Sequence, residues 1–215
     1  MRLYSYFRSS AAFRVRIALA VKDIDYQIIP IHLTKDGGQQ KTDAYKKINP
    51  QGLVPALETD GGDTLTQSLA ILEYIEETYP KPHILPKNAV QRAYVRSISN
   101  QIACDIHPLN NLRVLKYLEE KLLQPKDKVN LWYKHWIEQG LKPLEETIAT
   151  SRYKGIFCCG DQVSMADICL IPQLYNARRF NCSMGTYPTL LSIEQECLKQ
   201  SAFLKSLPQN QPDAE

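Results

Sequence analysis

Two neighbouring serines, Ser9 and Ser10, lie where side-chain hydroxyls could stabilise an anion. They follow an apolar, β-prone run at residues 3–7 and precede apolar residues at helical spacing between residues 13 and 21. This pattern predicts a strand, a tight turn and a helix whose first turn carries both hydroxyls. Ser is a preferred N-cap, and the free amides at a helix N-terminus favour negative charge, so the turn suits a thiolate or a carboxylate. The simpler alternative is that the serines only cap the helix.

The composition favours a globular chain that acts on a small molecule. Its 215 residues, 44% of them hydrophobic, allow one large domain or two small ones. No apolar run approaches the roughly 20 residues of a membrane span, and Met1 leads into a strand rather than a cleavable signal, so we expect a cytoplasmic protein. The net charge is only +3 with the signs interleaved, which favours neither nucleic acid nor membrane as a partner.

The cysteines and histidines show no metal-binding or disulfide pattern. The four histidines are scattered along the chain, and none stands near a cysteine pair in a zinc spacing. A cytosolic chain of this size does not need disulfides, so we expect buried thiols and no metal site. The six cysteines all lie in the second half: Cys104, Cys158, Cys159, Cys169, Cys182 and Cys197.

The first 80 residues have the element order of a thioredoxin-like domain. A β-rich run at 26–33 would pair in parallel with the first strand through a right-handed crossover, and a weak helix would end near residue 48. Two short strands, at 53–58 and 64–66, would form a hairpin, followed by an amphipathic helix at 67–77. This βαβαββα order assigns residues 1–80 to one domain and makes Pro55 the cis proline of that fold.

The second half reads as an all-α domain over residues 88–215. Three prolines between residues 80 and 86 indicate a linker, and helices are expected at about 89–123, 129–150, 165–179 and 190–202. Ser164 and Asp167 have the spacing of a capping box. The polar tail from residue 208 onward is expected to fray. The fold class is therefore α/β followed by all-α.

At this point the chain resembles the cytosolic glutathione transferases, and within them the zeta class. The Ser-Ser turn followed by Arg14-Val15-Arg16 is the motif most specific to that class, whereas Gln67-Ser68 and the capping box are shared more widely. The resemblance covers essentially the whole chain and rests on residues 4–10, 14–19, 38–40, 49–55, 67–71, 108–112, 160–167 and 172–180. It implies the cytosolic glutathione transferase fold and a homodimer.

The resemblance also implies that glutathione binds as a cofactor along the edge of the first domain. Its thiol would face the catalytic residues Ser9 and Ser10. Val54 offers backbone groups to a strand-like ligand, and Ser68 at a helix start suits a carboxylate. The implied cofactor-binding positions are Ser9, Ser10, Ala11, Gln40, Val54, Pro55, Gln67, Ser68, His107, Asn111, Leu112 and Arg113.

Two arginines, Arg8 and Arg179, are implied to bind a substrate carboxylate. A guanidinium matches a carboxylate bidentately, so the residue type suits a diacid substrate. The alternative for Arg179 is a helix-end cation favoured by the dipole, because Arg178 stands next to it.

The activity implied by the resemblance is the isomerisation of maleylacetoacetate to fumarylacetoacetate in tyrosine and phenylalanine catabolism. Glutathione thiolate would add to a cis double bond conjugated to a carbonyl, and its expulsion after bond rotation would leave the trans isomer. A serine hydroxyl and helix amides would favour the thiolate. Transferase side activity is also expected of the class.

Some residues depart from the family, and they bear on the alternatives. Ala11 and Phe13 stand where Cys and Trp are usual, and His107 replaces a common Gln. A glutathione-dependent reductase would need a cysteine in the serine turn, but the first cysteine is Cys104. An enzyme for maleylpyruvate or small α-halo acids fits the motifs equally. A non-catalytic binding module is weakened by the retained glutathione positions.

Overall fold

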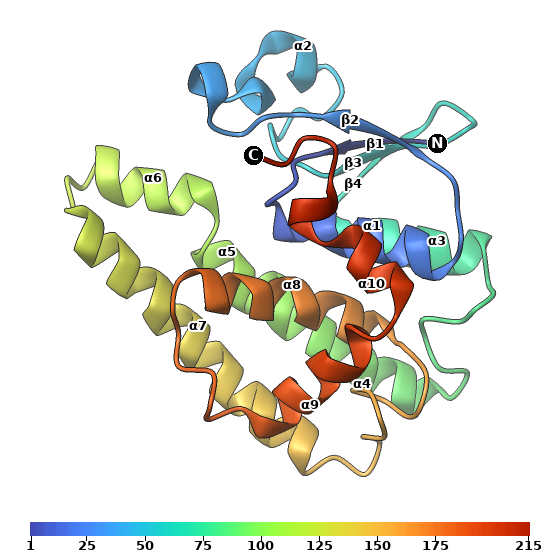
Figure 1. The fold of residues 1–215 in the computed structure, drawn as a ribbon. Helices are drawn as coiled ribbons and strands as arrows, with labels where there is room; N and C mark the ends of the chain where they lie inside the picture. Colours follow the sequence, from blue (N-terminus) through green and yellow to red (C-terminus); the bar gives the residue numbers. More distant parts are fainter. The chain divides into compact units, whose positions relative to one another are not determined.

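The computed structural model describes residues 1–215, which fold into two compact units. The first unit comprises Met1–Ile84 together with Leu198–Glu215, and the second comprises Leu85–Cys197 (Figure 1). Residues 198–215, which the sequence analysis placed in the helical part, lie in the first unit.

A mixed four-stranded sheet in the order β2-β1-β3-β4 forms the centre of the first unit. β1 (Arg2–Ser5) pairs in parallel with β2 (Gln27–Pro30) and antiparallel with β3 (Ala56–Glu58), which pairs antiparallel with β4 (Thr64–Thr66). Parallel neighbours need a crossover, and α1 (Ser10–Val21) supplies it. The predicted thioredoxin-like order is confirmed.

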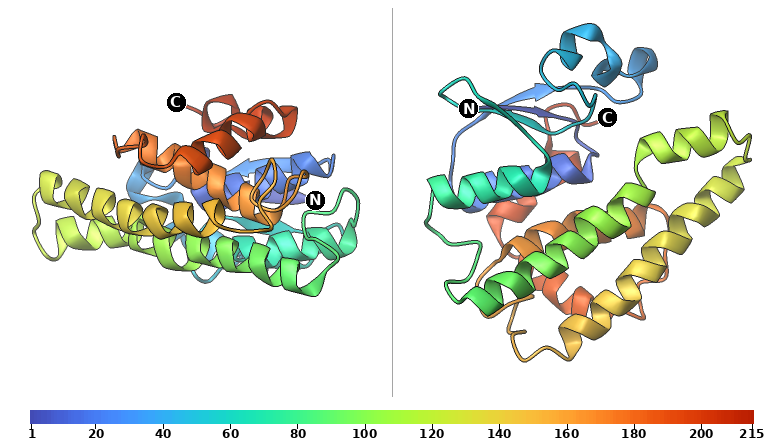
Figure 2. Two further views of the ribbon diagram at one scale, coloured as in Figure 1. Left: turned by 90° about the horizontal axis from the view of Figure 1, so that it is seen from below. Right: turned by 180° about the vertical axis from the view of Figure 1, so that it is seen from behind.

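Helices α1 and α3 (Ser68–Thr78) lie side by side, as Figure 2 shows from behind. They bury Phe13 and Ile17 from α1 and Ile71 from α3, which are almost fully removed from solvent. The weak helix expected before residue 48 is the short α2 (Asp43–Lys46), which follows the 3-10 turns η1 (Lys35–Gly37) and η2 (Gln39–Lys41).

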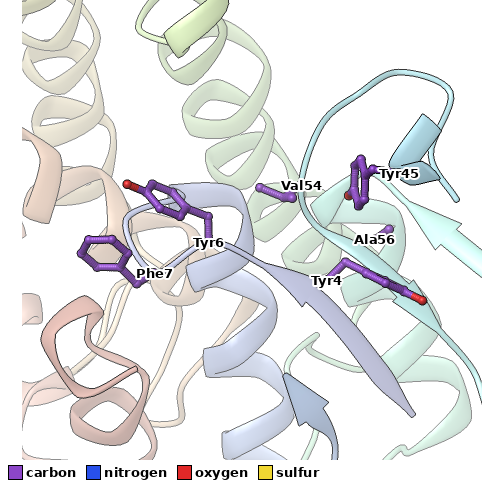
Figure 3. Packing of buried hydrophobic residues seen from close by; sticks show 6 residues of the cluster. All are labelled: Tyr4, Tyr6, Phe7, Tyr45, Val54 and Ala56. Atoms are coloured by element: carbon purple, nitrogen blue, oxygen red, sulfur yellow. The ribbon is translucent and has the colours of Figure 1, made fainter. Parts of the chain in front are cut away.

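A second apolar cluster packs around the end of β1, where the chain enters the serine turn, and around the start of β3. Figure 3 shows its members, which are Tyr4, Tyr6, Phe7, Tyr45, Val54 and Ala56. The Tyr45 hydroxyl and the Asn49 side-chain amide both donate to the Leu53 carbonyl oxygen, each at 2.7 Å. These two bonds fix the chain just before Val54.

The C-terminal segment is ordered, so the prediction that residues 208–215 fray is wrong. α10 (Ser201–Ser206) packs on α1, and η4 (Pro208–Asn210) follows it. The Asn210 side chain donates to the Leu204 carbonyl at 2.7 Å, and the Gln211 side chain donates to the carbonyls of Lys205 and Leu207 at 2.9 and 3.0 Å. Polar residues that looked solvent-bound therefore satisfy the free carbonyls at the end of α10.

The second unit is helical throughout. Its elements are α4 (Ala89–Asn100), the π-helical η3 (Gln101–Ile106), α5 (His107–Leu109), α6 (Leu112–Glu120), α7 (Lys126–Ala149), α8 (Met165–Arg179) and α9 (Pro188–Cys197). None of these helices, nor any in the first unit, combines the length and apolar character that a membrane crossing requires.

The helix boundaries of the second unit differ from expectation in two places. The helix predicted at 89–123 breaks because Asn111 begins a new helix, its side-chain oxygen accepting from the Arg113 N–H at 3.1 Å. The helix predicted at 190–202 is two helices, α9 and α10. The capping box is confirmed: the Asp167 carboxylate accepts from the Ser164 N–H at 2.8 Å.

All six cysteines are free thiols. Five are buried as expected, but Cys104 is exposed, so the expectation is wrong for that residue. Burial raises the pKa of the Cys158 thiol well above its ordinary value and raises that of Cys182 to about 11, so these thiols stay protonated at neutral pH.

Candidate functional site

The turn between β1 and α1 presents the Ser9 hydroxyl as a hydrogen-bond donor. The Ser9 N–H donates to the Tyr6 carbonyl at 2.9 Å, and the Phe13 N–H closes the first helical bond on the Ser9 carbonyl at 2.8 Å. Ser9 is the N-cap, and its Oγ accepts from the Ala12 N–H at 3.2 Å. A hydroxyl has two acceptor pairs and one hydrogen, so the cap leaves that hydrogen available to a ligand.

Ser10 and Ala11 add backbone donors to the same turn. They are the first two residues of α1, at the positive end of the helix dipole. The Ser10 side chain is buried, whereas Ser9 and Ala11 are only partly covered. The predicted N-cap is thus confirmed for Ser9, and an anion beside it would meet the hydroxyl and the positive end of the helix.

Val54 and Pro55 form a cis peptide bond, as predicted. The pairing of β1 with β3 begins at Ala56, so the backbone of Val54 lies outside the sheet ladder. Its N–H and C=O groups are therefore placed to pair with an extended ligand at the end of β3.

The start of α3 carries a strained residue beside a buried hydroxyl. Gln67 has φ 67° and ψ 114°, in the left-handed half of backbone space that residues other than glycine rarely occupy. Its side-chain amide donates to Gln51 at 2.8 Å. Ser68 is buried, and its Oγ accepts from the Arg14 guanidinium at 3.2 Å. Strain of this kind clusters at ligand clamps, and the nearby cation suits a carboxylate.

Arg14 is a buried cation beside Ser68, and the sequence analysis did not name it as a candidate site residue. It is 2% exposed although it lies in a short helix of apolar residues. The signal was present in the Arg-Val-Arg run, which puts two cations on helix positions that the surrounding apolar pattern marks as buried.

Gln40 lies in η2 and is buried. Its amide nitrogen donates to the Leu33 carbonyl at 3.1 Å, while its buried side-chain oxygen has no donor. Gly38 has φ 104°, and a Cβ there would lie 2.7 Å from the Gln40 amide nitrogen, so only glycine leaves room. A ligand N–H would satisfy the unpaired oxygen, because such buried acceptors are normally bonded.

Arg8 lies in the serine turn and is exposed. Its guanidinium sits 4.8 Å from the centre of the Phe7 ring and donates to the Tyr6 hydroxyl at 3.0 Å. These contacts hold a cation one residue before Ser9, which is consistent with the predicted contact to a substrate carboxylate.

In the second unit, four predicted positions gather around the break between η3 and α6. His107 begins α5, Asn111 caps α6, and Leu112 and Arg113 are the first two residues of α6. The Asn111 side chain is occupied by its cap, and Arg113 is exposed.

The two arginines at the end of α8 have different surroundings. Arg178 donates to both oxygens of Glu194, which neutralises its charge. Arg179 forms no ion pair with a carboxylate of the chain and lies 4.9 Å from the centre of the Phe180 ring, which stacks on Tyr133 at 3.5 Å. Burial raises the pKa of Tyr133 to about 12, with the charge of Arg179 opposing it. Arg179 is thus the one with charge left for a ligand.

The chain is similar over its whole length to known proteins. Residues 1–77 match the family described as Glutathione S-transferase, N-terminal domain, and residues 137–189 match Glutathione S-transferase, C-terminal domain. A maleylacetoacetate isomerase of Mus musculus is 50% identical over 212 residues, which span 98% of this chain and 94% of that protein. The chain belongs to the zeta class of the glutathione transferases.

Two solved structures carry the same similarity into three dimensions. A maleylacetoacetate isomerase from Methylobacterium extorquens AM1 with bound malonate and glutathione is 40% identical, with full coverage of both chains and a TM-score of 0.96. A holo maleyl pyruvate isomerase, described as a bacterial glutathione S-transferase of the zeta class, is 39% identical, with full coverage and a TM-score of 0.96.

The first unit of this zeta-class transferase brings polar side chains and free backbone groups to the helix starts and to the cis proline. No group of three or more His, Cys, Asp or Glu side chains is arranged to hold a metal ion. The first unit supplies the Ser9 and Ser68 hydroxyls, the backbone of Val54 and the unpaired Gln40 side-chain oxygen. Donors and acceptors of this kind suit a ligand with a thiol, an amide backbone and carboxylates.

Proposed function

We propose that this protein is a glutathione-dependent cis–trans isomerase that converts maleylacetoacetate to fumarylacetoacetate in tyrosine and phenylalanine catabolism. The observation that carries the proposal is the Ser9 hydroxyl, which caps α1 with its oxygen and keeps its hydrogen for an anion. The names of the full-length relatives support the same activity.

Glutathione is the cofactor that the first unit fits. Ser9 faces its thiol, Val54 pairs with its cysteinyl backbone, and Gln67 with Ser68 holds the γ-glutamyl end. Gln40 lies along the glycyl arm, where its unpaired side-chain oxygen needs a donor. We assign glutathione binding to residues 1–80 and substrate selection to the helical residues 88–197.

When bound, glutathione supplies a thiolate that adds reversibly to the cis double bond, so that rotation and expulsion give the trans isomer. Ser9 donates a hydrogen bond to that sulfur and so favours thiolate over thiol. The amides of Ser10 and Ala11 add the helix dipole to the same effect. Arg8 or Arg179 holds a carboxylate of the diacid, which fixes the double bond against the sulfur.

The test is an absorbance assay of maleylacetoacetate with purified protein. We expect isomerisation with glutathione and none with S-methylglutathione, which can occupy the same site but has no thiol to ionise. Equal rates with both compounds, or without either, would refute a thiolate mechanism. Retention on glutathione resin without any turnover would point instead to the binding module.

Maleylpyruvate is the second candidate substrate. It is favoured by the similarity to the zeta-class maleyl pyruvate isomerase. Both substrates are cis diacids with a conjugated carbonyl, so the same residues serve either. The ratio of kcat/KM for the two substrates decides between them.

We further propose a cytoplasmic homodimer. Six free cysteines suit a reducing compartment. Light scattering of the purified protein should give twice the mass of one chain, and a single-chain mass would refute the dimer.

A further inference from the structure

The C-terminal segment contacts the serine turn directly. The Phe7 N–H donates to the Asp213 carboxylate at 2.9 Å, although the two residues are 206 positions apart in sequence. The Arg16 guanidinium donates through two nitrogens to the Ser206 carbonyl, at 3.2 Å each. This carbonyl closes α10, whose C-terminal end favours a cation.

Arg16 joins α10 to the backbone of the turn. Its side chain is fully buried, and it also donates to the Phe7 carbonyl at 3.0 Å, the Ser5 hydroxyl at 3.1 Å and the Tyr6 carbonyl at 3.4 Å. Burial lowers the pKa of Arg16 to about 10, with the charges of Tyr26 and Asp213 opposing the shift, so the guanidinium stays charged at neutral pH.

The backbone that leads to Ser9 is therefore held from both sides. The Tyr6 carbonyl accepts from the Ser9 N–H at 2.9 Å, the Phe7 N–H is held by Asp213, and the Phe7 carbonyl is held by Arg16. In Figure 1, α10 lies beside α1, and the chain after it returns toward the end of β1. Without Asp213 the Phe7 N–H would lose its only charged acceptor.

We propose that Asp213 is a positioning residue that fixes the serine turn and thereby the Ser9 hydroxyl. The inference rests on the proposed function, since it matters only if Ser9 acts on the thiolate. A displacement of about 1 Å at a reacting group costs on the order of 100-fold in rate, so one anchoring bond is enough to affect turnover. The alternative is that the tail only stabilises the fold.

The test compares three variants of the full-length chain. Asp213→Ala removes the acceptor, and Asp213→Asn keeps an oxygen acceptor without the charge. Glu215→Gln is the matched control, because the Glu215 carboxylate lies in the same tail and bonds the His32 ring at 3.1 Å rather than the backbone of the serine turn. Three quantities are measured: hydrogen exchange at the Phe7 amide, the ultraviolet absorbance of bound glutathione thiolate across pH, and kcat with KM. Thermal melting identifies any variant that fails to fold.

For Asp213→Ala we expect exchange at Phe7 to rise about 10- to 100-fold, as for loss of a hydrogen bond to a charged group. The pKa of the bound thiol should rise and kcat should fall by about 10-fold or more, with KM for the diacid nearly unchanged. Asp213→Asn should restore most of the thiolate, and Glu215→Gln should match the wild type.

Three results would overturn the inference. Faster exchange at Phe7 with an unchanged thiolate and kcat would show a purely structural contact. More thiolate in Asp213→Asn than in the wild type would show that the Asp213 charge opposes the thiolate rather than positioning its donor. If Asp213→Ala does not fold, Asp213→Asn is compared with Ser9→Ala. An equal loss of thiolate in these two variants would also contradict positioning by the Asp213 side-chain oxygen. Absence of thiolate and turnover in the wild type would refute the proposed function itself, whereas the exchange measurement is independent of it.

Discussion

Replacing Ser9 by alanine removes two contributions of one hydroxyl, which are the N-cap of α1 and the hydrogen bond to the thiolate, and these should differ in size. The Ser9 oxygen caps α1 through the Ala12 N–H, and loss of an N-cap costs about 1 kcal/mol. In a chain of this size that lowers Tm by about 2–4 °C, which is small against a usual stability of about 5–15 kcal/mol. Ser9→Ala should therefore remain folded at 25 °C.

The catalytic loss should be much larger. Removing one preorganised donor from a developing or bound anion typically costs about 10² to 10³ in rate, equivalent to about 2.7–4 kcal/mol. The assay is kcat for the isomerisation as a function of pH. In Ser9→Ala the acid limb should move toward the ordinary thiol pKa of about 8.5, because the thiolate has lost its donor.

Two further substitutions distinguish the cap from the donor. Ser9→Gly removes the hydroxyl but costs the cap only a few tenths of a kcal/mol, so Tm should stay near the wild type while activity falls as in Ser9→Ala. Ser9→Asp keeps the cap but places a negative charge against the thiolate, so it should be stable and inactive. Near-normal turnover in Ser9→Ala with loss in Ser10→Ala would reverse the assignment of the two hydroxyls.

Three other predictions follow from the same structure. Arg179→Ala should raise KM for the diacid at least about 10-fold and leave glutathione affinity unchanged. Arg178→Ala is the matched control and should leave KM for the diacid unchanged, because Arg178 is paired with Glu194. Equal losses with an uncharged electrophile would show that Arg179 only supports the helix. Iodoacetamide under native conditions should label Cys104 alone, as seen by mass spectrometry, and most isomerase activity should remain after desalting and fresh glutathione; loss in both wild type and Cys104→Ala would implicate another protein thiol. Although burial opposes ionisation, hydrogen bonds from the Ile84 N–H and from buried Lys22 hold the pKa of the Glu76 carboxyl below its ordinary value, so its contribution is present above the unfolded pKa and is lost as the pH falls through the folded pKa. Glu76→Gln should destabilise by about 3–5 kcal/mol at pH 7, because it leaves Lys22 buried without its counter-ion. The difference from the wild type in denaturant unfolding should shrink as the pH falls through the folded pKa of Glu76, and a difference that stays constant down to the acid unfolding of the wild type would contradict this linkage.

Local sequence patterns were sufficient for the elements that carry the serine turn and the cis proline. Ser9 stands between an apolar run and a helical period, so its capping position follows from neighbours within four residues. Pro55 at the start of a short strand is equally local. These features depend on turn chemistry and periodicity, which the amino-acid types express directly.

Features that depend on distant contacts were missed or misread. Residues 208–215 were predicted to fray because they are polar. In the structure the Asp213 carboxylate accepts from the Phe7 N–H, and no sequence pattern connects these two residues. Arg16 belongs to a motif typical of the class, but the sequence did not indicate that its guanidinium is fully buried against carbonyls from both ends of the chain. The left-handed backbone of Gln67 gave no signal, because strain there is imposed by the surrounding fold.

Glutathione should act as a cofactor that is regenerated and not consumed, and a stoichiometric measurement decides this. Maleylacetoacetate is supplied in large excess over glutathione, and product isomer and free thiol are measured in the same reaction. If glutathione is regenerated in each turnover, we expect complete conversion to the trans isomer with no change in the concentration of free thiol. Conversion that stops at one equivalent per glutathione, with accumulation of an adduct, would contradict it.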